Sequence, residues 1–412
     1  MAILILSNGH GEDVIAVSIA QQLQDLCNTL DITALPLVGE GHAYKKADIP
    51  ITGLVKKMPS GGFNQDPKQL LRDILGGLLG LTYYQYKTIR QWGKNGGKIL
   101  AVGDLVPLLL AWLSGADYGF VGTAKSEYYL RHETDWLPQT SLLERWFGSM
   151  YFPWERWLMS DCRCQAVFPR DSLTAKILQQ WQIPIFDLGN PMMDGLEVSK
   201  TPILMTNKDS LTVLLLPGSR SPESQENWQI ILESVGCLIA NFSEKSLLFL
   251  AAIAPSLSLD FFSQDLLSKG WINQKQEKAL ISLNDPEQLV FTQQRARLIL
   301  TQHSYSNCLQ IADLAIAMSG TATEQFVGLG KPVITIPGKG PQFTLNFAKK
   351  QTYLLGESVI LVKHPEQVTR AIQSLLQDPQ RLHSIAANGR KRLGDPGAAK
   401  RIAECLFNQG FC

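Results

Sequence analysis

The sequence has no long apolar run. Its longest uncharged apolar stretch, residues 105–116, is 12 residues long, whereas a helix that spans a bilayer needs about 20. The N-terminus has no basic segment, and its apolar stretch ends at Leu6, which is too short for a secretory signal peptide. We therefore expect a cytoplasmic protein without a membrane-spanning segment.

Basic clusters and a regular cysteine pattern are also missing. The chain has 38 Lys and Arg against 37 Asp and Glu, and its longest basic cluster is residues 390–392. Proteins that bind nucleic acid usually carry a strongly basic surface, so we expect no nucleic-acid partner. The seven cysteines are odd in number and scattered, and Cys162 and Cys164 lack the spacing of a zinc knuckle. We expect a reducing compartment and no metal site.

Short apolar runs alternate with longer amphipathic segments along the whole chain. This alternation is typical of β-α-β units that build a parallel sheet, and 412 residues fit two domains better than one. We predict an α/β protein with two sheets of similar size, in two Rossmann-like doubly wound domains that face a cleft. The expected strands are residues 2–6, 32–38, 99–103, 118–122, 165–168 and 185–188, then one starting at 211, followed by 247–253, 297–301, 314–318, 333–336 and 359–362.

The periodicity lapses near residue 195, where Gly, Ser, Thr, Pro, Asn and Lys prevail. We predict an acceptor-binding domain at residues 1–195, a linker at 196–210, a nucleotide-binding domain at 211–385 and a C-terminal helical segment at 386–412. Ligands of doubly wound sheets bind at the carboxyl ends of the strands, so the loops that follow strands are the candidate sites.

The first candidate loop of the second domain follows the strand that starts at residue 211. Gly218, Ser219 and Arg220 lead from it into a helical pattern that begins around Glu223. Backbone N–H groups, a hydroxyl and a guanidinium at a helix N-terminus suit a phosphate. Alternatively, Ser219 caps the helix and Arg220 is solvated.

A second loop follows the strand at residues 314–318 and has the same strand, loop and helix pattern. Glycine permits close approach to a ligand, hydroxyls donate to phosphate, and a carboxylate accepts from ribose hydroxyls. Alone, this loop could be an ordinary helix start, but two such loops on one sheet favour a nucleoside diphosphate. Its candidate residues are Ser319, Gly320, Thr321, Ala322, Thr323, Glu324 and Gln325.

Gln342 and Asn346 follow the strand at residues 333–336 and lie one helical turn apart. Paired amide donors and acceptors suit sugar hydroxyls. The alternative is two exposed amides on a helix.

These motifs resemble those of a known family. The second domain carries LLPGSR followed by Glu223, and then SGTATEQFVGLGKPVITIP with Gln342 downstream. These segments resemble the nucleotide-sugar half of GT-B glycosyltransferases, most closely that of the lipid-A-disaccharide synthase family. In the first half, SNGHGEDVIA resembles that family's first loop and Gly103-Asp104 its strand-Asp loop. LGNPMMD resembles its interdomain segment.

The resemblance implies a UDP-sugar co-substrate in the second domain, an acceptor in the first, and metal-independent inverting transfer with no other cofactor. By this resemblance Arg220 neutralises the diphosphate, which Ser319, Gly320 and Thr321 cradle. The family's ribose-binding carboxylate lies seven residues before the proline of the next strand, which here is Gln325.

Glu324 lies one residue before that position. Which of the two side chains, Glu324 or Gln325, binds the ribose is therefore left open, as is the identity of the nucleotide.

Inverting transfer needs a base for the acceptor hydroxyl. Asp104 is the first candidate, because it follows an apolar strand and matches the family position of the base; it would equally serve as the cap of a helix over residues 105–112. His10 is the rival, since an imidazole is a competent base near pH 7 and related GT-B transferases of peptidoglycan lipid synthesis carry a His in a Gly-rich first loop.

The rest of the first loop would contact the acceptor. Gly9 and Gly11 let backbone approach the substrate, and Asn8 and Asp13 are polar contacts, with Asp13 a positioning or capping group rather than the base.

Two segments of the first domain, residues 70–92 and 136–157, are rich in aromatic and aliphatic residues. They predict a lipid-like acceptor and peripheral contact with the cytoplasmic face of a membrane. The alternatives are packing within the domain or a homo-oligomer. Charge does not decide, because residues 1–195 carry 17 Lys and Arg against 19 Asp and Glu.

The predicted function is transfer of an N-acyl glucosamine-like sugar from UDP to a lipid-linked or acylated sugar acceptor. The alternatives are a UDP-sugar epimerase or hydrolase on the same fold, and a non-catalytic UDP-sugar-binding scaffold.

Overall fold

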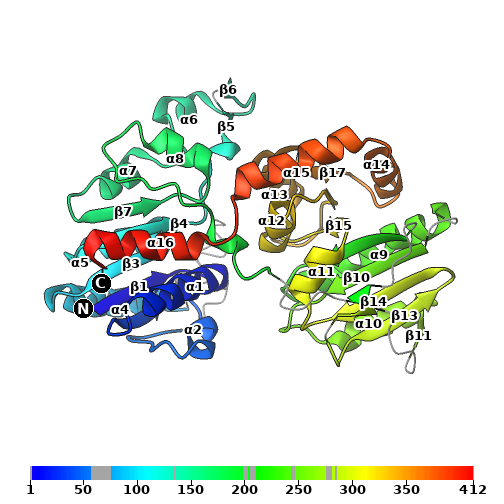
Figure 1. Ribbon diagram of the computed structural model, residues 1–412, viewed down its shortest axis with the longest axis horizontal. Helices are drawn as coiled ribbons and strands as arrows, with labels where there is room; N and C mark the ends of the chain where they lie inside the picture. The colour runs from blue at the N-terminus through cyan, green and yellow to red at the C-terminus, as the bar shows by residue number, and fades with distance from the viewer. Residues whose placement is uncertain are drawn as a thin grey trace. The chain divides into compact units, whose positions relative to one another are not determined.

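Each half of the chain forms its own mainly parallel sheet (Figure 1). The computed structural model describes residues 2–56, 76–133, 135–197, 203–204, 210–242, 246–274, 281–283 and 285–411. Its chain divides into unit 1, which is Met1–Asp194 with Gly394–Cys412, and unit 2, which is Gly195–Leu393.

The sheet of unit 1 has five parallel strands in the order β2-β1-β3-β4-β7. These strands are almost entirely buried, as expected for a parallel sheet with helices on both faces. Their bounds are β1 (Ala2–Ser7), β2 (Asp31–Pro36), β3 (Lys98–Gly103), β4 (Tyr118–Gly122) and β7 (Cys164–Phe168).

Helices cover both faces of this sheet. The apolar core of one face includes residues of α4 (Leu78–Lys94), α5 (Leu105–Ser114) and α7 (Pro153–Met159). The other face packs against α1 (His10–Leu26) and α16 (Ala398–Leu406). The remaining elements are α2 (His42–Lys46), η1 (Glu127–Tyr129), β5 (Arg131–His132), β6 (Asp135–Trp136), α6 (Leu142–Phe147), α8 (Ser172–Leu178), η2 (Pro191–Met193) and η4 (Phe407–Phe411).

The sheet of unit 2 has eight strands in the order β11-β13-β14-β10-β9-β15-β16-β17. Six are parallel, and β13 and β11 add an antiparallel edge. The strands are β9 (Ser210–Leu216), β10 (Ser246–Ala252), β11 (Ile272–Asn273), β13 (Leu289–Gln293), β14 (Ala296–Thr301), β15 (Leu314–Ala317), β16 (Val333–Thr335) and β17 (Val359–Leu361), and β8 (Ile203–Leu204) pairs with β12 (Ile281–Ser282). The helices are α9 (Glu223–Asn241), α10 (Leu259–Ser268), α11 (Tyr305–Ile311), α12 (Thr321–Gly328), α13 (Leu345–Leu355), η3 (Gly356–Ser358), α14 (Gln367–Leu376) and α15 (Pro379–Leu393).

Eleven of the twelve expected strands are confirmed within one or two residues. The strand expected at residues 185–188 is wrong, because only Ile185 pairs, at a single bridge with Val167. Pro184 before it has no N–H to donate to a ladder. The expectation of two sheets of similar size is also wrong. The sheet of unit 1 has five strands and that of unit 2 has eight, because β11 and β13 form an antiparallel edge that we did not expect.

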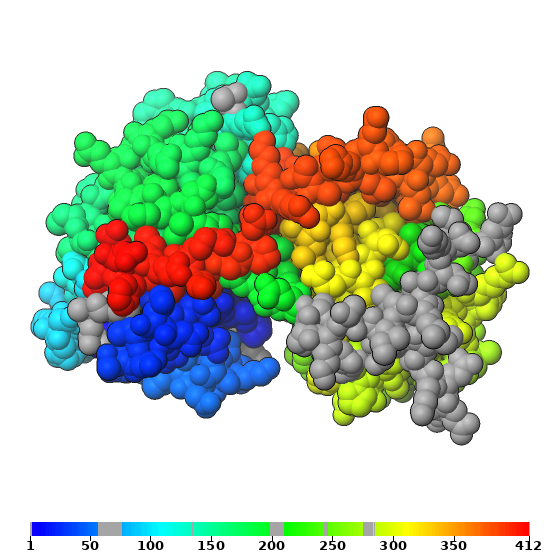
Figure 2. Space-filling view, viewed as in Figure 1, coloured from blue at the N-terminus to red at the C-terminus, as the bar shows by residue number. Residues whose placement is uncertain are grey.

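The C-terminal segment does not form a separate element. It is helical, as expected, but the chain leaves unit 2 after α15 and α16 returns to unit 1. Asp194 accepts hydrogen bonds from the backbone N–H groups of Gly397, Ala398 and Ala399 at the start of α16. The buried face of α16 packs on α1, and Figure 2 shows the C-terminal residues in red against the N-terminal residues in blue.

The expected linker is not simply a connection. Gly195 already belongs to unit 2, and the short strand β8 pairs within that unit. Residues 198–202 and 205–209 of the expected linker lie outside the described residues.

Candidate functional site

The first candidate site lies where the strand order of unit 1 changes direction. From β1 the chain builds β2 on one side and then crosses to β3 on the other side, so the loops after β1 and β3 diverge and leave a crevice at their carboxyl ends. Asn8 follows β1 and Asp104 follows β3, and Asn8 Nδ2 donates to Asp104 Oδ1 at 2.7 Å. A Cβ at Gly103, which has a φ of +139°, would lie 2.0 Å from Asn8 Oδ1, so this contact requires glycine.

Asp104 also caps α5. Its Oδ1 accepts from the backbone N–H of Val106 at 2.9 Å, which leaves Oδ2 outside the cap. Burial raises the pKa of Asp104, and the hydrogen bonds from Val106 and Asn8 partly oppose that shift. A raised pKa suits a carboxylate to a general base role, because proton transfer is most effective when the base's pKa approaches the working pH.

Lys125, which no motif in the sequence indicated, adds a positive charge at this edge of the sheet. It follows β4, and its charge lowers the pKa of Asp104. Lys125 Nζ lies 2.5 Å from Glu155 Oε2, and Glu155 is 1% exposed. The ammonium also lies 4.6 Å from the centre of the Phe152 ring. The sequence signal that could have indicated Lys125 is its place in the loop after β4, the third loop at this edge of the sheet.

The loop after β1 exposes His10 and Gly11, which begin α1, while Gly9 is the N-cap residue. Asp13, which we expected to contact the acceptor, is only 3% exposed and lies in the interior behind the loop. Its Oδ1 accepts from Ser7 Oγ at 2.6 Å.

Asp13 belongs to a chain of hydrogen bonds. Ser7 Oγ, which donates to Asp13, accepts from the hydroxyl of Tyr44 at 2.7 Å. Burial raises the pKa of Asp13 to about 6.

Unit 2 has an equivalent change of direction. From β9 the chain builds β10 and β14 on one side and crosses to β15 on the other, so the loops after β9 and β15 lie at the switch point. The side chain of Asn227, on α9, ties them together: its Nδ2 donates to the carbonyl of Pro217 at 3.0 Å and to that of Met318 at 3.4 Å.

Gln351, on α13, holds the second loop in the same way. Its Nε2 donates to the carbonyls of Ser319 and Gly320 at 3.0 and 3.4 Å. Because C=O and N–H point in opposite directions in a trans peptide, carbonyls held by these amides turn the following N–H groups outward. Successive outward N–H groups form a concavity that binds anions. The N–H groups concerned belong to Gly218, Ser319, Gly320 and Thr321.

The loop after β16 packs against the start of α9. Glu223 Oε1 accepts from the backbone N–H groups of Gln342 and Phe343 at 3.0 and 2.6 Å. A Cβ at Gly340 would lie 2.4 Å from Glu223 Cγ, so the loop approaches α9 closely. Three loops of unit 2, those after β9, β15 and β16, therefore meet around the start of α9.

The predicted nucleotide-binding side chains differ in exposure. Ser219, Arg220, Thr321 and Asn346 are exposed, whereas Thr323 is buried and donates from Oγ1 to the carbonyl of Ser319 at 2.7 Å. Gly218, Ser319, Gly320, Ala322, Glu324, Gln325 and Gln342 are partly buried.

Gln325 has a partner that the sequence did not indicate. The hydroxyl of Tyr305, on α11, donates to Gln325 Oε1 at 2.7 Å. This bond fixes the orientation of the Gln325 amide.

In the part of the chain that the structure describes, no group of three or more His, Cys, Asp or Glu side chains could hold a metal ion. Among the same residues no helix is both long and apolar enough to cross a bilayer.

No family model matches the chain. A curated protein, lipid-A-disaccharide synthase from Syntrophus aciditrophicus (strain SB), is 25% identical over 257 residues, which are 55% of this chain and 58% of that protein. The chain therefore matches little more than half of that relative's length.

Several solved structures resemble the whole chain. UDP-GlcNAc 2-epimerase from Neisseria meningitidis, bound to UDP-GlcNAc, is 16% identical with a TM-score of 0.55, covering 99% of this chain and 100% of that one. MurG from Acinetobacter baumannii is 13% identical with a TM-score of 0.56, covering 99% of each chain. MnaA from S. aureus, with UDP, is 13% identical with a TM-score of 0.60, covering 100% of this chain and 97% of that one. These likenesses show that the chain has the GT-B fold, with two Rossmann-like domains.

Proposed function

We propose that the protein is an inverting glycosyltransferase that moves an N-acyl glucosamine-like sugar from UDP to a lipid-linked or acylated sugar acceptor. The observation that carries the proposal is the pair of loops at the switch point of unit 2, which Asn227 and Gln351 hold with their N–H groups outward. The name of the curated relative, and the UDP and UDP-GlcNAc in the titles of similar structures, support a UDP-sugar as the donor.

In this proposal unit 2 holds the donor. The outward N–H groups and the exposed guanidinium of Arg220 meet the negative charge of the diphosphate, which grows when the bond from the sugar's anomeric carbon to UDP breaks. The amide of Gln325, oriented by Tyr305, and the carboxylate of Glu324 are the groups proposed for the ribose. Gln342 and Asn346 are proposed for the sugar hydroxyls.

Unit 1 activates the acceptor. Asp104 takes the proton from the acceptor hydroxyl as its oxygen bonds to the anomeric carbon, and UDP leaves with the electron pair of the broken bond. His10 is the second candidate for this proton, because its imidazole is exposed on the neighbouring loop. Asn8, Gly9 and Gly11 are proposed to contact the acceptor.

A UDP-sugar epimerase is the second candidate function, since several structures of this fold are named UDP-GlcNAc 2-epimerases. Such an enzyme returns the sugar to UDP or releases it and needs no acceptor. A hydrolase would release the sugar to water. A non-catalytic scaffold would bind the UDP-sugar and leave it intact.

Thermal stabilisation by UDP-, GDP-, ADP- and TDP-sugars tests the donor assignment. A ligand that binds only the folded state raises the apparent stability, so we expect a higher Tm with UDP-sugars. Arg220→Ala should weaken UDP binding by about 1.5–3 kcal/mol, the usual value of a hydrogen bond to a charged group. No shift with any nucleotide sugar would contradict the proposed donor site.

A further inference from the structure

Phe347 is an exposed aromatic side chain beside the second loop of unit 2. It lies in the first turn of α13 and is 40% exposed. A single exposed phenylalanine needs no explanation by itself. This one is distinguished by its position, because a Cβ at Gly320 would lie 3.7 Å from the ring atom Cζ of Phe347. The ring is therefore within van der Waals reach of the loop proposed to hold the diphosphate.

Helix α13 keeps Phe347 on the side of that loop. Gln351 lies four residues further along the helix, so the two side chains share one helix face. The Nε2 of Gln351 donates to the carbonyls of Ser319 and Gly320 at 3.0 and 3.4 Å. The loop is thus held against the turn that carries Gln351, and Phe347 lies one turn nearer the start of the helix.

The ring of Phe347 is supported by Phe343. The two ring centres lie 5.4 Å apart at an angle of 56°, and Phe343 is itself only 4% exposed. The backbone N–H of Phe347 donates to Thr344 Oγ1 at 3.2 Å, and Thr344 is the N-cap residue of α13. One part of the ring packs on the protein while another part faces outward, so a ligand that binds it has little side-chain motion to arrest.

We propose that the outward part of Phe347 packs against the C–H face of the donor's sugar ring. The sugar is bonded to the second phosphate of the nucleotide, so a diphosphate held by the N–H groups of Ser319 and Gly320 brings the sugar close to Phe347. A pyranose ring carries C–H groups on its faces, and the negative face of an aromatic ring attracts them. Asn346, the preceding residue on the same helix, is the amide proposed for the sugar hydroxyls.

The inference rests on the proposed function and assigns a residue to the sugar half of the donor. The uracil base is a poorer match for Phe347, because the ribose and the first phosphate separate it from the second phosphate. An N-acyl group is also a poorer match, because it lies at the edge of a sugar ring and not on its face. Phe347 would therefore make the site favour a nucleotide that carries a pyranose over the bare nucleotide.

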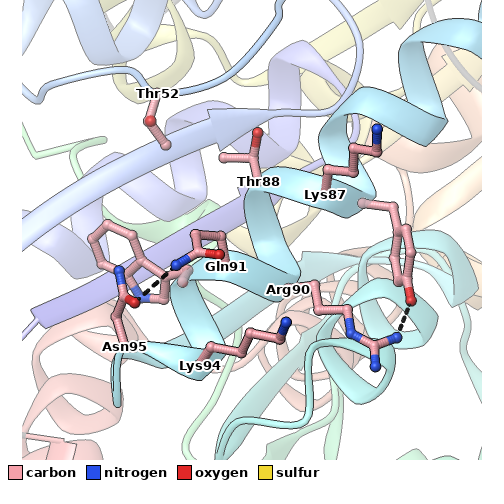
Figure 3. Close-up of a pocket in the computed structure, with 9 residues that line it drawn as sticks. Thr52, Lys87, Thr88, Arg90, Gln91, Lys94 and Asn95 are labelled. Carbon is pink, nitrogen blue, oxygen red and sulfur yellow. Dashed lines mark hydrogen bonds between the residues drawn. The ribbon is translucent and has the colours of Figure 1, made fainter.

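A cavity of about 630 Å³ in unit 1 is a less suitable place for the sugar (Figure 3). Figure 3 shows that α4 and Thr52 line it, and that Gln91 turns toward Asn95, to which its amide donates at 3.0 Å. Because α4 leads into the start of β3, this part of α4 lies toward the amino ends of the strands, whereas ligands of such sheets bind at the carboxyl ends. Residues 70–75 of the aromatic segment expected at 70–92 lie outside the described residues. Gln91→Ala should leave the affinity for UDP-GlcNAc unchanged, and a loss there would move the sugar away from Phe347.

Isothermal titration with UDP, UDP-glucose and UDP-GlcNAc, in the absence of an acceptor, tests the proposal. Phe347→Ala should lower the affinity for both UDP-sugars about 5- to 10-fold, the usual value of an aromatic contact, and should leave the affinity for UDP unchanged. The unchanged affinity for UDP also shows that the variant is folded at the site. Phe347→Tyr keeps the ring and should bind all three ligands like the parent chain.

Leu345→Ala and Phe407→Ala are the matched controls. Leu345 is 43% exposed and lies two residues before Phe347, on the other side of the helix. Phe407 is 46% exposed and follows α16 in unit 1. Each control removes an apolar side chain of similar exposure, and both should bind UDP-GlcNAc like the parent chain.

Three results with Phe347→Ala would overturn the proposal. An equal loss of affinity for UDP would assign the ring to the nucleotide, and a loss with UDP-GlcNAc but not with UDP-glucose would assign it to the acyl group. Unchanged affinity for both UDP-sugars would show that the ring touches neither.

These titrations separate the proposed contact from the proposed reaction. No acceptor is present, so an epimerase that binds the same donor would give the same pattern. If the parent chain does not bind UDP, both the donor site and the contact of Phe347 are wrong. If the parent chain binds UDP and Phe347→Ala keeps its affinity for the UDP-sugars, only the contact is wrong.

Discussion

Asn8 Nδ2 donates to Asp104 Oδ1 at 2.7 Å and joins two loops that lie 96 residues apart in the sequence. The bond crosses the switch point of unit 1, where a doubly wound sheet leaves room for a ligand. It favours the charged form of a carboxylate whose burial favours the neutral form. The balance between the two effects sets the pH at which Asp104 can accept a proton.

Asn8→Ala should therefore move the acid limb of the pH profile. Without the amide donor, the pKa of Asp104 rises further, and kcat/KM should fall at a pH about one unit higher than in the parent enzyme, since a hydrogen bond to a charge is worth roughly 1.5 kcal/mol or more. The measurement is kcat/KM from pH 4 to 9. Asn241→Ala, on an exposed residue at the end of α9, is the control. Superimposable profiles for Asn8→Ala and the parent would exclude Asp104 as the titrating base.

The amides of Asn227 and Gln351 hold the two loops of unit 2, so their loss should weaken binding of the diphosphate rather than binding of the nucleoside. A carboxylate at residue 227 cannot donate to the carbonyls of Pro217 and Met318, so Asn227→Asp should release both loops and weaken UDP binding about 10- to 100-fold, while uridine affinity changes little. Isothermal titration with UDP and with uridine separates the two contributions.

Asn241→Asp supplies the same charge change on the same helix, away from the loops, and should leave UDP affinity unchanged. Equal losses of UDP and uridine affinity in Asn227→Asp would point to general unfolding of the site instead.

Glu155 and Lys125 form a buried ion pair whose rupture should be costly. Lys125→Met leaves a carboxylate that is 1% exposed without its cation, which typically costs about 3–5 kcal/mol of unfolding free energy. Lys125→Met with Glu155→Gln should recover much of this loss, because the remaining amide is neutral. Urea unfolding of the two single variants and the double variant gives the coupling. Additive effects would contradict the pair.

The strand and loop pattern explains why Asp104 and the two loops of unit 2 could be predicted, whereas other residues could not. Local sequence specifies a strand, a glycine-containing turn and a helix, and the fold places the ends of parallel strands at one edge. Asn227 and Gln351 act from helices on loops far from them in the sequence, so no short motif contains both partners.

The position of Asp13 was likewise not visible in the sequence. Its neighbours Glu12 and His10 face outward to different degrees, but its burial depends on Tyr44, which arrives from α2. The return of α16 to unit 1 depends on Asp194, some 200 residues from the amides that it binds.

Burial of Asp13 predicts a pH dependence of stability. Its pKa of about 6 in the folded chain exceeds the ordinary value of 3.8, so the folded chain holds an extra proton between these pH values. The free energy of unfolding should then fall as pH rises through this window, by about 3 kcal/mol from this group.

Asp13→Asn cannot titrate, so its stability relative to the parent should improve by about that amount between pH 4 and 7 in urea unfolding. Asp25→Asn, an exposed carboxylate of the same helix, is the control. A constant difference between Asp13→Asn and the parent would show that Asp13 does not titrate in this window.

The fate of a labelled sugar tests the central claim most directly. The parent enzyme and Asp104→Asn are incubated with a UDP-sugar labelled in the sugar, in the presence of vesicles that contain an acylated glucosamine phosphate. Transfer predicts label in the lipid phase and free UDP with the parent, and neither with Asp104→Asn, although the variant still binds UDP. Label that stays on UDP as an epimer, appears as free sugar in water, or reaches lipid equally with Asp104→Asn would contradict a glycosyltransferase in which Asp104 is the base.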